Sequence, residues 1–204
     1  MRSKFKYYIG IISCVMLVLA SACDVFPTRT PEDPINPNSN IIPPTTPYLA
    51  LDNFINSVNN AEYSNYAQCF ASKISGQSKE FEYIPSGSSK ANYPGLFNEW
   101  HSNEEIRNFK SIINSLKVET KPVLVINNIQ YNSFSADSVN LTGDYSLSLE
   151  IKNNINVSHY LGQVLLSLYR ENNGLWYINQ WVDIDSKTDE TGSTWSTLKA
   201  SFSN

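Results

Sequence analysis

Residues 137–151 have the sequence DSVNLTGDYSLSLEI, in which apolar and polar side chains alternate. From position 139 the odd-numbered residues are apolar or aromatic apart from Gly143, and the even-numbered residues are Asn, Thr, Asp, Ser, Ser and Glu. A period of two is typical of a strand with one buried face. The stretch therefore predicts a β-strand whose odd-numbered side chains face the core.

Strand-like periodicity continues on both sides of this stretch, and turns that carry Asn, Asp or Gly interrupt it. The expected long strands cover about 118–132, 137–151, 157–170 and 175–185. A shorter strand is expected over 80–84, where it stops at Pro85 because proline donates no backbone hydrogen bond. A short helix over 194–201 is expected to close the domain.

Before residue 117 the apolar residues recur at helical spacing instead. Thr46 is an N-cap candidate with Pro47 at the first helical position, and a second helix is expected from about Glu62. Ser102 and Glu105 have the spacing of a capping box at the start of a third helix. Helices followed by a meander of strands predict an α+β fold, with the N-terminal helices packed on one face of an antiparallel sheet.

Three stretches carry a resemblance to a known superfamily: TPYLALDNF at 46–54, YAQCF at 66–70 and GLWYI at 174–178. Over about residues 46–185 this layout resembles the nuclear transport factor 2-like superfamily. The resemblance implies a strongly curved sheet wrapped round the helices as a cone, often with a pocket at the wide end, and frequent dimerisation through the outer face of the sheet. That superfamily includes isomerases, dehydratases, hydrolases and non-catalytic binding modules, so the fold does not select a function.

The first 22 residues have the three-part pattern of an export signal: three cationic residues, an apolar stretch over 7–19, and small residues at 20–22 before Cys23. Small residues followed by Cys resemble the lipobox of bacterial lipoproteins, although such boxes prefer Leu where this chain has Ala20. We expect residues 1–22 to be removed and Cys23 to carry a lipid anchor. Ordinary secretion is the alternative.

Seven of the ten prolines lie between residues 24 and 47, and such a segment favours an extended spacer over a helix or a central strand. We therefore expect a lipid-anchored tether over 23–45 and a single α+β domain over 46–204. The nearest likeness is to bacterial lipoproteins in which a domain of this kind follows a proline-rich tether. The protein is expected to be exported and held at a bacterial membrane through its lipid, facing the periplasm or the cell exterior.

Composition excludes several function classes. Lys and Arg total 15 against 19 Asp and Glu, and no basic run offers a stripe for nucleic acid. Two separated histidines and the one thiol downstream of Cys23, at Cys69, do not supply a usual zinc site. No glycine-rich phosphate loop is present. The sequence thus predicts no metal and no cofactor, and Cys69 is expected to be a buried, inert thiol.

The acidic residues of the strands over 80–84 and 137–151 fall on their polar faces, which argues against a buried acid pair of the kind that acid–base enzymes use. Three residues are catalytic candidates by type and position. His159 fits better as a surface or satisfied residue, His101 as the residue before a helix, and Asp183 as a solvated strand end. We therefore expect a non-catalytic module.

The aromatic residues suggest one functional hypothesis, because Tyr and Trp favour sites that are partly apolar and partly exposed to water. The candidate pocket lining is Tyr83, Trp100, Tyr145, His159, Trp176 and Asp183, and ordinary packing is the alternative. The expected partner is a small apolar ligand or a protein, with homodimerisation as a further expectation. Two alternative functions stay open: an isomerase-, dehydratase- or hydrolase-type enzyme that uses His159 or Asp183, and a dimerising assembly subunit.

Overall fold

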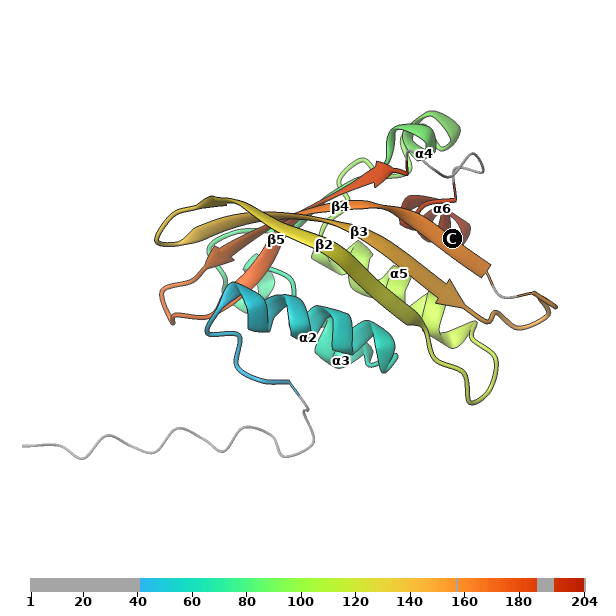
Figure 1. Cartoon of the computed structure of the whole chain (residues 1–204), viewed down its shortest axis with the longest axis horizontal. Helices are drawn as coiled ribbons and strands as arrows, with labels where there is room; N and C mark the ends of the chain where they lie inside the picture. The colour runs from blue at the N-terminus through green and yellow to red at the C-terminus, as the bar shows by residue number, and fades with distance from the viewer. Residues whose placement is uncertain (1–40, 157, 187–192, 204) are drawn as a thin grey trace, which may run out of the picture. The chain divides into compact units, whose positions relative to one another are not determined.

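The computed structural model describes residues 41–156, 158–186 and 193–203 (Figure 1). The elements, in chain order, are α2 (Pro47–Asn59), α3 (Tyr63–Ala67), η2 (Lys73–Ser75), β1 (Glu82–Ile84), α4 (Gly87–Asn92), α5 (Ser102–Asn114), β2 (Val123–Phe134), β3 (Ser138–Leu149), β4 (Ser158–Arg170), β5 (Trp176–Asp185) and α6 (Trp195–Ser201). The predicted signal peptide, the predicted lipidation site Cys23 and most of the predicted tether lie outside the described residues. Within them, no helix combines the length and apolarity that crossing a membrane requires.

The five strands form one mixed sheet in the order β1-β5-β4-β3-β2. Neighbouring strands are antiparallel except β1, which pairs parallel to β5 with Tyr83 opposite Trp181. The expectation of a wholly antiparallel sheet was therefore wrong at this edge. Strands joined by tight turns must run antiparallel, but β1 reaches the edge of β5 from a distant part of the chain, so no turn sets its direction.

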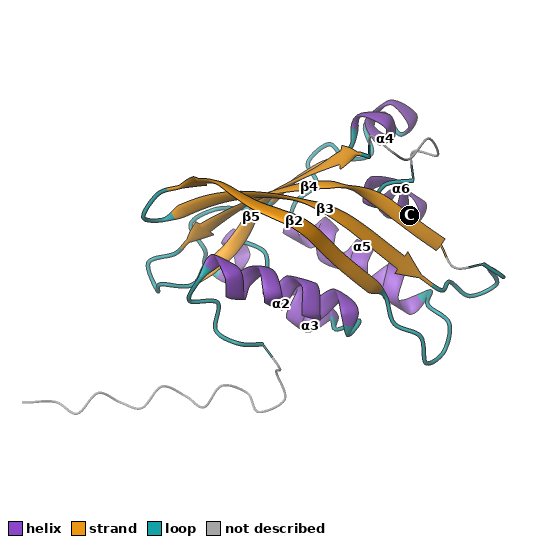
Figure 2. Cartoon of the chain, in the orientation of Figure 1, coloured by secondary structure: helices purple, strands orange, loops and turns teal. Residues whose placement is uncertain are grey.

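One face of this sheet, called the inner face below, packs against the helices α2, α3 and α5 (Figure 2). The alternation of β3 is confirmed, because its side chains are buried at every odd position from Val139 to Leu149. The core between the layers is rich in aromatic rings. Tyr66 of α3, for example, stacks on Phe109 of α5 with ring centroids 3.8 Å apart.

The start of α2 follows the predicted chemistry, since the Thr46 side chain accepts a hydrogen bond from Leu49 N at 3.2 Å. The start of α5 does not. Its N-cap is His101, whose backbone N–H donates to the Glu104 carboxylate at 3.3 Å. The capping box predicted for Ser102 and Glu105 was therefore wrong by one residue, and Glu105 is free to turn inward.

The segment just before α2 also belongs to the folded unit. Ile42 N and O exchange hydrogen bonds with the Asn53 side chain, at 3.3 and 2.6 Å, and Pro44 O accepts from Trp176 N at 2.8 Å. The contacts of the folded unit therefore extend at least to Ile42. A fragment meant to keep them should start before Ile42, for example at Ser39.

Candidate functional site

The C-terminal helix α6 occupies the interior, where it packs against β4, α4 and α5 (Figure 1). Four of its residues are buried: Trp195, Ser196, Leu198 and Lys199. Thr194 caps the helix and is buried as well. One face of α6 is thus buried against the inner side of the domain, and two polar clusters line the contact between α6 and the rest of the domain.

The first cluster surrounds Asp183, which is only 2% exposed to solvent. Its carboxylate accepts hydrogen bonds from Tyr145 Oη at 2.8 Å, from Ser196 N at 2.7 Å and from Ser196 Oγ. Tyr83 Oη lies 2.7 Å from Ser196 Oγ and 3.3 Å from Asp183 Oδ2. Burial raises the pKa of Asp183 above its ordinary value, although the bonds from Ser196 and Tyr145 oppose that rise.

The prediction of a solvated strand end at Asp183 was therefore wrong. Trp181 and Asp183 alternate inward along β5, as the strand period requires. The strand continues to Asp185, and α6 covers it from inside. Alternation predicts which side a residue faces, but it carries no information about a helix that covers the end of the strand.

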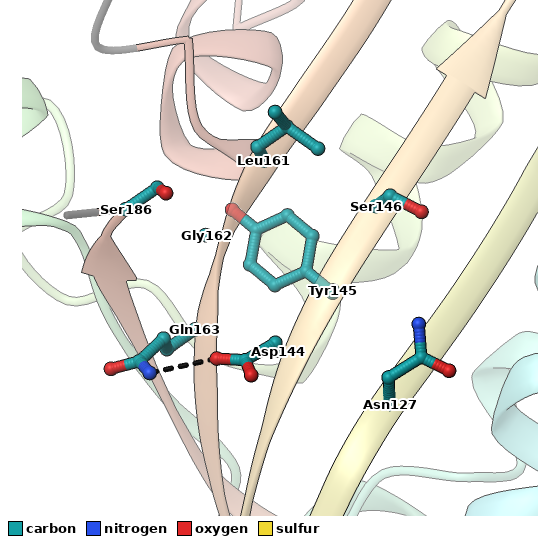
Figure 3. Close-up of a pocket in the computed structure, with 8 residues that line it drawn as sticks. All are labelled: Asn127, Asp144, Tyr145, Ser146, Leu161, Gly162, Gln163 and Ser186. Atoms are coloured by element: carbon teal, nitrogen blue, oxygen red, sulfur yellow. Dashed lines mark hydrogen bonds between the residues drawn. The ribbon is translucent and has the colours of Figure 1, made fainter. Parts of the chain in front are cut away.

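A glycine allows Tyr145 to reach Asp183 across an intervening strand. Tyr145 of β3 pairs with Gly162 of β4, which pairs with Asp185 of β5 (Figure 3). A Cβ at Gly162 would lie 2.6 Å from Tyr145 Oη and 2.8 Å from Ile184 O. The missing side chain therefore gives the Tyr145 ring room to lie across β4.

The second cluster is a buried ion pair between Lys199 of α6 and Glu105 of α5, both with side chains 1% exposed. Tyr66 Oη donates to Glu105 Oε1, and Trp100 Nε1 donates to Glu105 Oε2 at 2.8 Å. Lys199 Nζ lies 3.6 Å from the centroid of the Tyr83 ring. Burial lowers the pKa of Lys199 to about 8, although the Glu105 carboxylate opposes that fall.

The carboxylates of Glu105 and Asp183 thus lie buried beside α6 in separate clusters, and the sequence predicted neither as buried. The argument against a buried acid pair rested on β1 and β3, whereas Glu105 comes from α5 and Asp183 from β5. One signal for Glu105 was present in the sequence. It precedes Phe109 and Ile112 by four and seven residues, a spacing that puts all three on one helix face.

Four of the six predicted pocket residues come together in these clusters: Tyr83, Trp100, Tyr145 and Asp183. The other two predicted lining residues lie elsewhere. His159 is exposed on the outer face of β4, where its Nδ1 lies 2.9 Å from Ser148 Oγ. Trp176 is buried at the opposite end of β5 from Asp183.

The remaining candidates have structural explanations. His101 caps α5, and its Nδ1 lies 3.1 Å from Phe81 O. Cys69 is buried, its Sγ lies 3.3 Å from Asn65 O, and burial raises the pKa of the thiol to about 12, as expected for an inert cysteine. Within the described part of the chain, no group of three or more His, Cys, Asp or Glu residues is placed to hold a metal ion.

Two surface depressions are larger than the one of about 140 Å³ that lies beside Trp100 and Phe202. One, of about 450 Å³, lies mainly over the outer face of β2, β3 and β4 (Figure 3), and its lining is Asn127, Asp144, Tyr145, Ser146, Leu161, Gly162, Gln163 and Ser186. Bonds from Asn128 and Gln163 to the Asp144 carboxylate lower its pKa. The other, of about 620 Å³, runs beside β1 and the segment after α4.

Solved structures share this arrangement of helices and sheet. A nuclear transport factor 2-like superfamily protein from Salmonella enterica serovar Typhimurium is 14% identical, covers 69% of this chain and 89% of its own, and gives a TM-score of 0.52. A Kribbella flavida protein gives 0.52 at 6% identity over 74% of this chain and 92% of that one. A candidate dehydratase of the same family from Streptomyces avermitilis gives 0.50 at 10% identity over 67% and 91%. No protein-family model and no curated protein matches the sequence.

Proposed function

Because the fold is nuclear transport factor 2-like and α6 covers the buried carboxylate of Asp183, we propose that the domain is a non-catalytic binding or interaction module. We further propose that it belongs to an exported bacterial lipoprotein, anchored through Cys23 and facing the periplasm or the cell exterior. The observation that supports the first proposal is the position of α6 against Asp183. The signal-like pattern at residues 1–23 supports the second.

Asp183 is not available as a general base in this arrangement. A general base must reach the proton that it removes, within hydrogen-bond distance of the substrate. Here the carboxylate already accepts four hydrogen bonds, two of them from Ser196 of α6, one from Tyr145 and one from Tyr83. A substrate would have to displace α6 to reach it. With α6 in place, a partner has to bind on the surface of the domain, where the two depressions lie.

The enzyme alternative has one observation in its favour. Asp183 is a buried carboxyl of raised pKa beside two phenols, which is a chemistry suited to proton transfer. One similar structure is also named as a candidate dehydratase. An enzyme that uses Asp183 requires α6 to move away from this carboxylate, whereas the binding module does not. The mobility of α6 therefore distinguishes the two proposed functions.

A disulfide bond that holds α6 in place tests whether any activity requires α6 to move. Ser89 Oγ of α4 lies 3.2 Å from Thr197 Oγ1 of α6, so Ser89→Cys with Thr197→Cys brings two thiols together. The wild-type and locked proteins are incubated with a metabolite extract of the cells that carry them, and mass spectrometry records what is consumed. We expect the two extracts to be the same. A metabolite that wild type consumes, that the locked protein spares, and that is consumed again after reduction would establish the enzyme alternative.

A further inference from the structure

Four buried side chains surround the ammonium group of Lys199, and all of them come from segments other than α6. They are Tyr83 of β1, Trp100 just before α5, Glu105 of α5 and Trp181 of β5. The receptor for the ammonium group therefore belongs to the body of the domain. Only its occupant belongs to the C-terminal helix.

Neutral groups fix the position of the receptor carboxylate. Tyr66 Oη and Trp100 Nε1 donate to the two oxygens of Glu105, and neither donor carries a charge. The negative charge of Glu105 is therefore balanced by Lys199. A buried carboxylate without a counter-ion is strongly destabilising, so the site requires a cation.

Aromatic rings supply the rest of the receptor. Lys199 Nζ lies 3.6 Å from the ring centroid of Tyr83, 4.1 Å from that of Trp181 and 5.8 Å from that of Trp100. These separations are within the range of cation–π attraction, which is strongest where water is excluded. A carboxylate and several ring faces together attract an ammonium group and offset part of the cost of its burial.

The shape of the site favours a primary ammonium group over a guanidinium. A guanidinium pairs best with both oxygens of a carboxylate at once. In Glu105, Oε1 already accepts from Tyr66, and Lys199 bonds to Oε2. One oxygen is thus directed at the cation, which suits a compact charge on an alkyl stem.

We propose that the interior of this domain is a binding site for a primary alkylammonium group, which the chain fills with Lys199 of its own α6. An external primary amine and α6 compete for this site. Because Lys199 is attached to the domain, its effective concentration at the site is high, and a free amine binds strongly only when Lys199 is removed. The inference goes beyond the proposed surface-binding function and does not depend on it.

The test removes the occupant and replaces it from solution. Lys199→Ala deletes three methylene groups and the ammonium, and n-propylammonium has the same size and charge. We expect n-propylammonium chloride to raise the melting temperature of Lys199→Ala saturably, by about 5 °C well above its Kd. Sodium chloride at equal ionic strength and 1-propanol at equal concentration should have much smaller effects.

Two control variants make the result specific. Lys121→Ala removes an exposed lysine that bonds to Asn60, and n-propylammonium should not stabilise it. Lys199→Ala combined with Glu105→Gln keeps the cavity but removes the carboxylate that Lys199 contacts, so the response to n-propylammonium should fall to the size of the response to 1-propanol. An equal response to 1-propanol, or a response that Glu105→Gln leaves undiminished, would show an apolar cavity only and overturn the proposal.

A measurement on the wild-type protein keeps the proposal testable if Lys199→Ala does not fold. Ring faces at 3.6 and 4.1 Å from Nζ should displace the ε-methylene proton resonances of Lys199 upfield of those of exposed lysines. Lys199→Met assigns the displaced signals by their loss. Lysine spectra without such signals would mean that the rings do not enclose the ammonium group, which would refute the proposal.

Discussion

Replacing Gly162 with alanine should destabilise the domain far more than one added methyl group suggests. The new Cβ would lie 2.6 Å from Tyr145 Oη, 2.8 Å from Tyr145 Cε1 and 2.8 Å from Ile184 O. The tyrosine ring must move or the backbone of β5 must shift. If the ring moves, its hydroxyl group loses Asp183 as acceptor and Trp195 N as donor.

The size of the effect follows from these contacts. Overpacking a dense interior costs about 1–3 kcal/mol. A lost hydrogen bond to a charged group such as the Asp183 carboxylate adds about 1.5–3 kcal/mol. We therefore expect Gly162→Ala to lower the free energy of unfolding by about 3–5 kcal/mol.

The assay is urea unfolding of a soluble chain that begins at Ser39, arranged as a double-mutant cycle with Tyr145→Ala. Without the tyrosine ring, only the contact with Ile184 O remains, so Gly162→Ala should then cost about 1–2 kcal/mol. Equal costs in the two backgrounds would refute the claim that Gly162 makes room for Tyr145.

Three further predictions concern other parts of the chain. Cys23→Ser should move the protein from the membrane to the soluble fraction, because each acyl methylene contributes about 0.8 kcal/mol of binding; membrane retention would contradict the lipid anchor. Lys199 has a pKa of about 8, below its ordinary value of 10.5, so between these values the unfolded chain binds more protons and stability rises with pH. From pH 8 to 9.5 the free energy of unfolding of wild type should rise by about 1–2 kcal/mol relative to Lys199→Met, a comparison in which Cys69 and the tyrosines cancel; a constant difference would contradict the burial of the ammonium group. His159→Gln should change the free energy of unfolding by less than about 0.5 kcal/mol in urea, because His159 is exposed on the outer face; a larger loss would show that the residue packs against the domain.

Long periodic segments were the most predictable part of the fold. The four long strands and α6 begin and end within five residues of their expected limits, and strict alternation marks the strands. α4 was missed because its sequence, GSSKAN, is short and has no apolar stripe. It forms because Ser86 caps it and Ser89 is buried beside α6.

The interior polar clusters were predictable only in part. Tyr83, Trp100, Tyr145 and Asp183 were found from aromatic content and position on strands, but Asp183 was expected in solvent. Lys199 had no signal, since a lysine in a short terminal helix is normally exposed. Its burial depends on Glu105, which lies 94 positions away, and a pairing over that separation leaves no local pattern.

The parallel pairing of β1 with β5 has a consequence for the order of folding. Tyr83 and Asp183 are 100 positions apart, and Glu105 and Lys199 are 94 apart, so the interior joins an early part of the chain to its last residues. Closing such long loops costs conformational entropy before any contact is gained. The helices and the hairpins of β2–β4 can form from neighbouring sequence, but β5 and α6 have to arrive before the carboxylates are covered. A chain interrupted before β5 would leave the Glu105 carboxylate without its cation and the aromatic core exposed. The packing of β5 and α6 onto the rest of the domain is therefore the step that commits it to its native state.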